Sequence, residues 1–165
     1  MSEINNSEIN YPSIRYINLL ELLVTNTEET ESIKNRYLLL LSELTKTNYI
    51  ETSLFLKNVK KISQMGVIIV GVIGPSDNID IVASGTIIIE PKIIRGGKNV
   101  GHIEDIVVTE RLRGTGISKE ILNRLKTIAR ENNCYKVILD CDESVKNVYI
   151  KNSFKVKGIQ MAEYF

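Results

Sequence analysis

The centre of the chain reads Gly101-His102-Ile103-Glu104-Asp105-Ile106-Val107-Val108, and a few residues later Arg113-Gly114-Thr115-Gly116-Ile117-Ser118. The first segment predicts a β-strand that carries two adjacent carboxylates among apolar residues. Because a carboxylate buried without a partner is costly, two in succession indicate that this strand holds a polar ligand. The second segment predicts a turn of small residues opening onto an amphipathic helix, where free backbone N–H groups favour an anion. Together they predict a site that binds a phosphate-bearing molecule and carries out polar chemistry beside it.

The composition is that of one globular domain. The chain has 165 residues, of which 43% are hydrophobic, enough for a sizeable core. We expect residues 1–12 to be a polar tail and residues 13–165 to be a single domain. The net charge of +1 makes nucleic acid a poor partner. The apolar runs are too short to span a bilayer and no leader is evident, so we expect a cytoplasmic protein without a membrane partner.

Cysteine and histidine usage argues against a metal or disulfide framework. Cys134 and Cys141 fit a reducing compartment and are interpreted as packing thiols. A disulfide between them is excluded because they begin and end one extended segment. With His102 as the single histidine, no metal site is expected, and His102 itself is interpreted as structural.

Hydrophobic periodicity divides the chain into two halves. The first half predicts two helices and then an antiparallel meander, because short turns join only antiparallel neighbours. The expected helices span 28–45 and 51–62, and the expected strands span 67–73, 79–90 and 101–109, with turns at 74–78 and 95–99. The second half predicts a helix over 117–129, a strand over 135–140, a short helix over 144–152, and strands near Phe154 and Ile159. A helical crossover favours parallel pairing of the strands that begin at Gly101 and Tyr135, so the fold class is α/β or α+β around a mixed sheet.

These residues resemble the GNAT acetyltransferase superfamily, whose acetyl-CoA motif has the form Arg/Gln-x-x-Gly-x-Gly/Ala. The resemblance is strongest to the branch that acetylates the amine of glucosamine 6-phosphate, and it runs from about Ala83 to Met161. Its most specific segments are 101–106 and 134–142. The resemblance implies a GNAT fold, in which N-terminal helices and an antiparallel meander precede a βαβ-type acetyl-CoA-binding half. It also implies acetyl-CoA as cosubstrate, a homodimer, and a product used in UDP-N-acetylglucosamine synthesis.

The expected coenzyme site consists of a strand end and the glycine loop. The loop amides would bind the diphosphate, since small residues let its oxygens approach the backbone. The coenzyme-contacting residues implied are Ile106, Val107, Val108, Thr109, Arg113, Gly114, Thr115, Gly116, Ile117, Ser118, Lys119 and Tyr149. A bulge in this strand would leave an N–H near Ile106 to polarise the thioester carbonyl, an effect worth roughly 3 kcal/mol. Ser118 stands where the family has Gly or Ala, which predicts slightly weaker coenzyme binding.

The catalytic candidates are Glu104, Asp140 and Tyr149. An attacking amine must be neutral, and a partly desolvated carboxylate can accept its proton, so Glu104 is the expected base. The resemblance implies that Asp105 holds sugar hydroxyls, Asp140 orients the amine, and the Tyr149 hydroxyl donates to the leaving thiolate. The alternative for the two adjacent acids is an ion pair with Lys92, Arg95 or Lys136.

The remaining substrate contacts are implied by the resemblance alone. They are Thr45, Lys92, Arg95, Tyr135 and Lys136, beside Glu104, Asp105 and Asp140. Family members often carry a cation near the C-terminus that reads the phosphate across the dimer, whereas residues 161–165 have none. This departure leaves open an acetyltransferase for another small amine or an unphosphorylated aminosugar. A binding module without catalysis and a peptide acetyltransferase are further alternatives. Ser153 replaces a family glycine after the short helix, so a strained left-handed residue is expected there.

Overall fold

A computed structural model describes residues 13–75 and 78–165, which form a five-stranded sheet with helices on its two faces. The strands are β1 (Arg15–Asn18), β2 (Gly66–Ile73), β3 (Asp80–Pro91), β4 (Asn99–Val108) and β5 (Cys134–Ile138). They lie in the order β1-β2-β3-β4-β5, antiparallel from β1 to β4 and parallel between β4 and β5. The expected meander followed by a parallel pair is confirmed.

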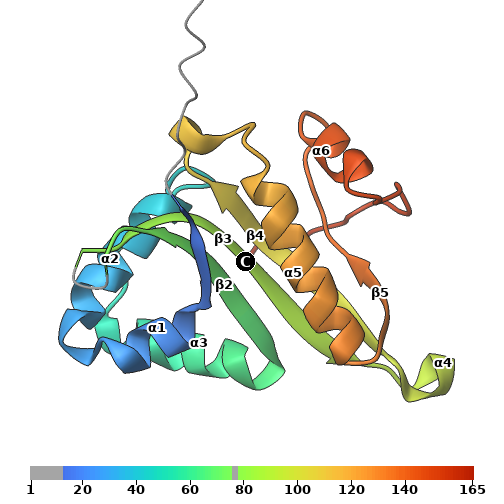
Figure 1. The fold of residues 1–165 in the computed structure, drawn as a ribbon. Coiled ribbons are helices and arrows are strands. Elements are labelled where there is room, and N and C mark those ends of the chain that lie inside the picture. The colour runs from blue at the N-terminus through green and yellow to red at the C-terminus, as the bar shows by residue number, and fades with distance from the viewer. Residues whose placement is uncertain (1–12, 76–77) are drawn as a thin grey trace, which may run out of the picture.

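Helices lie on both faces of the sheet, and one short helix lies at the tip of the connection between β3 and β4 (Figure 1). They are α1 (Leu19–Thr25), α2 (Thr30–Leu41), α3 (Thr52–Met65), α4 (Ile94–Gly97), α5 (Ile117–Glu131) and α6 (Lys146–Lys151), with the 3-10 turns η1 (Thr27–Glu29) and η2 (Glu110–Leu112). One core cluster joins α1, α2 and α3 to β2 and includes Val107 of β4. The second core lies beneath α5, whose apolar stripe is buried as its periodicity predicts.

A buried lysine attaches α2 to the segment that follows it. Lys34 is fully buried, and its Nζ donates to Thr52 Oγ1 at 2.9 Å and to the Ile50 carbonyl at 3.2 Å. The same Nζ lies 2.7 Å from a carboxylate oxygen of Glu31. Because a buried ammonium needs all of its donors satisfied, these contacts fix the connection between α2 and α3.

Two elements near the N-terminus are additions to the expected fold. β1 and α1 precede the first predicted helix, and the Asn18 side chain caps α1 by accepting from the Leu20 N–H at 2.9 Å. The predicted helix over 28–45 is α2, which ends at Leu41. The turn expected over 74–78 includes residues 76 and 77, which lie outside the described residues.

The strands expected near Phe154 and Ile159 are wrong for this single chain. Residues 152–165 form no strand, and Val156 and Ile159 are exposed. β5 is the edge strand of the described sheet, and residues 152–165 do not pair with its free edge.

Two further observations concern only the described part of the chain. Its helices are each too short or too polar to cross a lipid bilayer. It contains no group of three or more His, Cys, Asp or Glu side chains arranged to hold a metal ion.

Candidate functional site

The strand register places a polar row on the sheet face opposite α5. Ile87 and Ile103 are paired neighbours that point into the core beneath α5, so their flanking residues point to the other face. On that other face, Thr86 pairs with Glu104 and Ile88 pairs with His102, which in turn is opposite Ile138 of β5. Helices α1, α2 and α3 pack against the β2 side of this face, as Figure 1 shows. We call the part of this face formed by the end of β3, by β4 and by the residues after β5 the acidic face; it carries Glu90, His102, Glu104, Asp105 and Asp140.

A β-bulge brings both acids of β4 to this face. Ser84 pairs with Val107 and Thr86 pairs with Glu104, so Asp105 and Ile106 together oppose the single residue Gly85. Asp105 takes a left-handed conformation with φ of 53°. Burial raises the pKa of Tyr37 on α2 to about 12, and the negative charge of Asp105 also raises it. The Asp105 carboxylate therefore lies on the α2 side of the sheet. The bulge implied near Ile106 is therefore present, and it overrides the alternation that would separate Glu104 from Asp105.

β4 and β5 pair only over the first part of β4. The pairing runs from Asn99 with Cys134 to His102 with Ile138, whereas β4 continues to Val108. Backbone groups of β4 beyond His102 on the side facing β5 therefore have no strand partner in the described chain. Such an edge can bind an extended ligand through backbone hydrogen bonds, as the implied pantetheine contacts at Ile106 to Thr109 require.

The carboxylates of the acidic face influence one another. Partial burial raises the pKa of Glu104, and the nearby charges of Asp105 and Asp140 raise it further, while His102 lowers it. Burial also raises the pKa of Asp105. Gln160 Nε2 donates to Asp140 Oδ2 at 3.0 Å, which places the C-terminal segment beside this residue. The structure thus brings together the three acids that the sequence predicted for the amine and sugar.

The cations offered as alternative partners of these acids bind elsewhere. Lys92 pairs with Glu90. The Arg95 guanidinium lies 5.7 Å from the centre of the Tyr135 ring, and Lys136 Nζ lies 5.6 Å from it. Within residues 13–75 and 78–165, Glu104 and Asp105 take part in no ion pair, so the ion-pair alternative is wrong for this chain.

Of the five residues predicted to contact the sugar phosphate, three lie next to one another, whereas Lys92 and Thr45 are not part of that group. Arg95, Tyr135 and Lys136 form one stacked cluster at the end of the sheet where β5 begins. Lys92 is held by Glu90, and Thr45 lies exposed in the segment after α2, with its N–H bonded to the Leu41 carbonyl at 3.1 Å.

The glycine loop leads into α5 with its amide groups available. Gly114 and Gly116 have φ of 78° and 89°, and neither has a neighbour within 4 Å of an added Cβ. Gly116 is the N-cap residue of α5 and provides no side-chain cap. The first N–H groups of the helix therefore have no intrahelical partner, as an anion site requires. Ser118 lies in the first turn and is not the cap, whereas Thr115 Oγ1 donates to the Leu112 carbonyl at 2.6 Å.

Tyr149 lies on α6 and is half-buried against the core beneath α5, to which Ile106 also packs. Its ring meets Phe154 edge-on, with 6.0 Å between centroids. Burial raises the pKa of Tyr149 above its ordinary value of 10.0, and negative charge on Cys141 raises it further, so the hydroxyl is a hydrogen-bond donor at neutral pH. Ser153 has φ of 69°, which confirms the expected left-handed residue after this helix. Cys141 is exposed, so only Cys134 fits the interpretation as a packing thiol.

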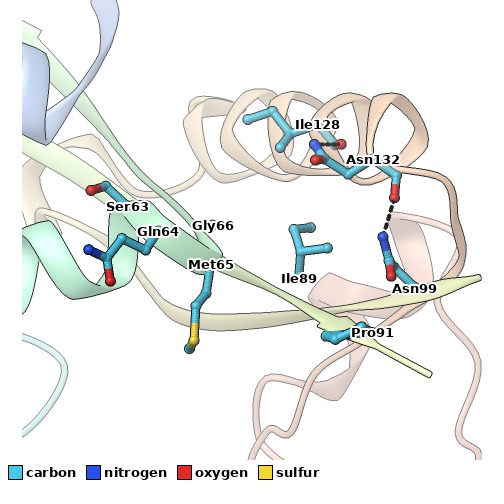
Figure 2. Close-up of a pocket in the computed structure, with 9 residues that line it drawn as sticks. All are labelled: Ser63, Gln64, Met65, Gly66, Ile89, Pro91, Asn99, Ile128 and Asn132. Carbon is cyan, nitrogen blue, oxygen red and sulfur yellow. Dashed lines mark hydrogen bonds between the residues drawn. The ribbon is translucent and has the colours of Figure 1, made fainter. Parts of the chain in front are cut away.

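A separate hollow of about 320 Å³ lies at another place in the fold (Figure 2). Its lining comes from the end of α3, the start of β2, the end of α5 and the adjoining parts of β3 and β4. The residues are Ser63, Gln64, Met65, Gly66, Ile89, Pro91, Asn99, Ile128 and Asn132. Asn99 Nδ2 donates to the Asn132 carbonyl at 2.8 Å, and Asn132 Nδ2 donates to the Ile128 carbonyl at 2.9 Å. None of the predicted site residues lines this hollow. The Asn99 side-chain amide connects the start of β4 to the end of α5, and the Asn132 side-chain amide binds back to α5.

Sequence reasoning missed two groups near the site. Glu90 holds both Lys92 and His102, and Glu43 contacts the segment between β4 and the glycine loop. Glu90 stands two residues before Lys92, which is a visible signal for an ion pair. Glu43 is 66 residues from Thr109, and no local pattern connects them.

The fold and site define an acyltransferase class in which a split parallel strand pair and a glycine loop bind the acyl donor. The acetyltransferase (GNAT) family model matches residues 42–152, and the chain belongs to this family. A solved structure of glucosamine-6-phosphate N-acetyltransferase from Arabidopsis thaliana superposes with a TM-score of 0.78 at 30% identity, covering 93% of this chain and 99% of that one. A Trypanosoma brucei acetyltransferase gives a TM-score of 0.74 at 31% identity, covering 94% and 100% of the two chains.

Several curated relatives are named glucosamine 6-phosphate N-acetyltransferase. A probable glucosamine 6-phosphate N-acetyltransferase 2 from Oryza sativa is 48% identical over 85 residues, which is 52% of this chain and 51% of that protein. The chain likewise spans about half the length of the Dictyostelium discoideum relative, at 54%. The Arabidopsis thaliana enzyme is 34% identical over 138 residues, which is 83% of this chain and 93% of that protein.

Proposed function

We propose that this chain transfers the acetyl group of acetyl-CoA to the amine of D-glucosamine 6-phosphate, giving N-acetylglucosamine 6-phosphate. The observation that carries the proposal is the acidic face: Glu104, Asp105 and Asp140 lie close together beside the part of β4 that β5 leaves unpaired. A cationic amine is attracted to such a cluster, and an extended coenzyme arm fits the open strand edge. The names of the relatives supply the substrate.

Glu104 is the proposed base. The substrate arrives as an ammonium ion, and a carboxylate with a raised pKa accepts its proton more readily than an ordinary one. Asp140 orients the amine and Asp105 holds sugar hydroxyls. The neutral nitrogen then attacks the thioester carbonyl directly, in a ternary complex without a covalent enzyme intermediate.

The β4 backbone and Tyr149 stabilise the charges that form next. Acetyl-CoA supplies the acyl group, and the residues proposed to hold it are Ile106 to Thr109 and Arg113 to Lys119. A free N–H near the Ile106 bulge would donate to the developing oxyanion. The Tyr149 hydroxyl, which is protonated at neutral pH, would give its proton to the departing CoA thiolate. The proton taken by Glu104 leaves to solvent, and the second proton, which the nitrogen loses as the amide forms, would return the Tyr149 phenolate to its phenol.

The sugar phosphate is proposed to bind at the Arg95–Tyr135–Lys136 cluster, with Lys92 and Thr45 as further contacts. Arg95 and Lys136 add two positive charges at one end of the sheet, and the tyrosine ring holds both near it. A phosphate with nearly two negative charges is favoured there.

The second candidate is an acetyltransferase for another small amine or an unphosphorylated aminosugar. It is favoured by the ion pair that neutralises Lys92 through Glu90, and by residues 161–165, which include Glu163 and no cation. The experiment compares CoA thiol release by the purified chain with glucosamine 6-phosphate and with glucosamine. We expect a clear preference for the phosphate ester. Equal rates would support the second candidate, and coenzyme binding without thiol release would indicate a binding module.

A homodimer is part of the proposal. Val156, Ile159, Met161, Tyr164 and Phe165 are all exposed in the single chain, and they follow α6, none of whose residues is fully buried. A second copy would cover these side chains and give the segment a strand partner. Light scattering during size-exclusion chromatography tests this, since a monomer at micromolar concentration contradicts it.

We propose the cytoplasm as the cellular setting. Both cysteines are free thiols, which suits the cytoplasm. The net charge of +1 gives no reason to expect nucleic acid or a membrane as a partner. The product would then supply UDP-N-acetylglucosamine synthesis.

A further inference from the structure

Glu43 connects the end of α2 to the segment between β4 and the glycine loop. Its Oε1 accepts from Thr109 Oγ1 at 2.8 Å, and its Oε2 accepts from the backbone N–H of Glu110 at 2.6 Å. Arg113 Nη2 lies 3.3 Å from the same Oε2, and Arg113 Nε donates to the Val108 carbonyl at 3.1 Å. We call Glu43, Thr109, Glu110 and Arg113 the Glu43 cluster. One carboxylate thus satisfies a hydroxyl, an amide and a guanidinium from a distant part of the chain.

We propose that Glu43 is a positioning residue for the acetyl-CoA site, which it holds in its binding geometry before the coenzyme arrives. The inference rests on the proposed function, because Thr109 and Arg113 are proposed coenzyme contacts. Gly114 and Gly116 have open space around them, so the glycine loop itself has few side-chain contacts to restrain it. The fixed points are the start of α5 on one side and, on the other, the Glu43 cluster together with Leu112, whose side chain is buried in the core beneath α5. A binding loop that is already ordered loses less entropy when its ligand binds.

Electrostatics alone would give Glu43 the opposite effect. Its negative charge lies at the segment that leads into a diphosphate site, so its repulsion of the ligand would weaken binding. If positioning dominates, removing the carboxylate weakens coenzyme binding; if repulsion dominates, removal strengthens it. The sign of the change therefore distinguishes the two.

The test compares Glu43→Ala, Glu43→Gln and a matched control, Glu28→Ala. Glu28 is an exposed carboxylate before α2, so its removal changes the net charge equally. By calorimetry on the full chain, we expect Glu43→Ala to raise the Kd for CoA about tenfold, the scale for losing charge-assisted hydrogen bonds. Glu43→Gln keeps an acceptor oxygen and should fall between Glu43→Ala and the unchanged chain. The KM for acetyl-CoA should rise more than kcat falls, and Glu28→Ala should match the unchanged chain.

A second readout does not depend on coenzyme binding. The Glu110 amide is bonded to Glu43 without any ligand, so its hydrogen exchange should be faster in Glu43→Ala and Glu43→Gln while core amides keep their protection. If Glu43→Ala does not fold, Glu43→Gln carries both measurements. Unchanged exchange at Glu110, or unchanged or tighter CoA binding by the variants, overturns the inference. Failure of the unchanged chain to bind CoA overturns the proposed function instead, and the exchange result still decides whether Glu43 orders this segment.

Discussion

His102 Nε2 lies 2.6 Å from Glu90 Oε2, and the other oxygen of the same carboxylate holds Lys92. The two residues sit on neighbouring strands of the acidic face, where Ile88 and His102 are directly paired. Glu90 therefore links His102 on this face to Lys92, which is proposed to bind phosphate. Hydrogen bonds from Lys92, and then from His102, lower the pKa of Glu90, so it stays ionised at neutral pH.

Glu90→Gln should sharpen the preference for a phosphorylated substrate. The change removes the charge that neutralises Lys92, and Lys92 then attracts the phosphate more strongly. We expect the ratio of kcat/KM for glucosamine 6-phosphate to that for glucosamine to rise about threefold, a modest electrostatic gain at a partly exposed site. Glu131→Gln, an exposed acid at the end of α5, is the control. A falling ratio would mean that Glu90 positions Lys92 and does not compete for it.

The pH profile should report the raised pKa of Glu104. A base works only when ionised, so kcat/KM should rise with pH through that pKa, which lies above the ordinary value of 4.5. Asp105→Asn removes a neighbouring charge that raises the pKa, so the acid limb should move to lower pH. Asp142→Asn, an exposed acid beyond β5, should leave it in place. If the acid limb of Asp105→Asn stays in place or moves to higher pH, the charge of Asp105 does not raise the pKa of the catalytic base.

Tyr149→Phe should lower turnover more than binding. A tyrosine is protonated at neutral pH and the raised pKa of Tyr149 keeps it so, while thiolate charge appears only as the bond to carbon breaks. We expect kcat to fall about tenfold to a hundredfold, as for other proton donors, with little change in the KM for either substrate. Tyr49→Phe, at an exposed tyrosine on the connection to α3, is the control. Equal turnover in a single-turnover experiment that isolates chemistry would remove Tyr149 from the mechanism.

Much of the fold could be predicted because its signals are local. The stripe of α5, the β-branched run of β2 and the turns between β2, β3 and β4 each follow from residues close in sequence. The strands expected near Phe154 and Ile159 failed for a different reason. Their alternation is suitable for a strand, but a strand also needs backbone pairing, and in the described chain these residues do not pair with β5, the edge strand of the sheet.

The site could be predicted only in part, because its geometry depends on register. Alternation along β4 would have pointed Glu104 and Asp105 to opposite faces. The bulge cancels this, and it needs both a left-handed Asp105 and a small residue opposite it. The same limit explains why Glu90 and Glu43 were missed as partners of His102 and Thr109. Their contacts form only after strands and helices distant in sequence have packed.

Gly85→Ala tests whether the bulge depends on its small partner. An added Cβ would lie 2.6 Å from both Ile106 Cδ1 and Ile121 Cγ2, so α5 or the bulge must move. We expect a loss of about 1–3 kcal/mol in the free energy of unfolding, typical of an overpacked core. We also expect lower kcat at temperatures where the variant remains folded, because the N–H near Ile106 is displaced. Gly158→Ala is the control, since nothing lies within 4 Å of its added methyl. Urea titration gives the stability and thiol release gives the rate; normal turnover in a destabilised variant would show that the reaction tolerates a shifted bulge.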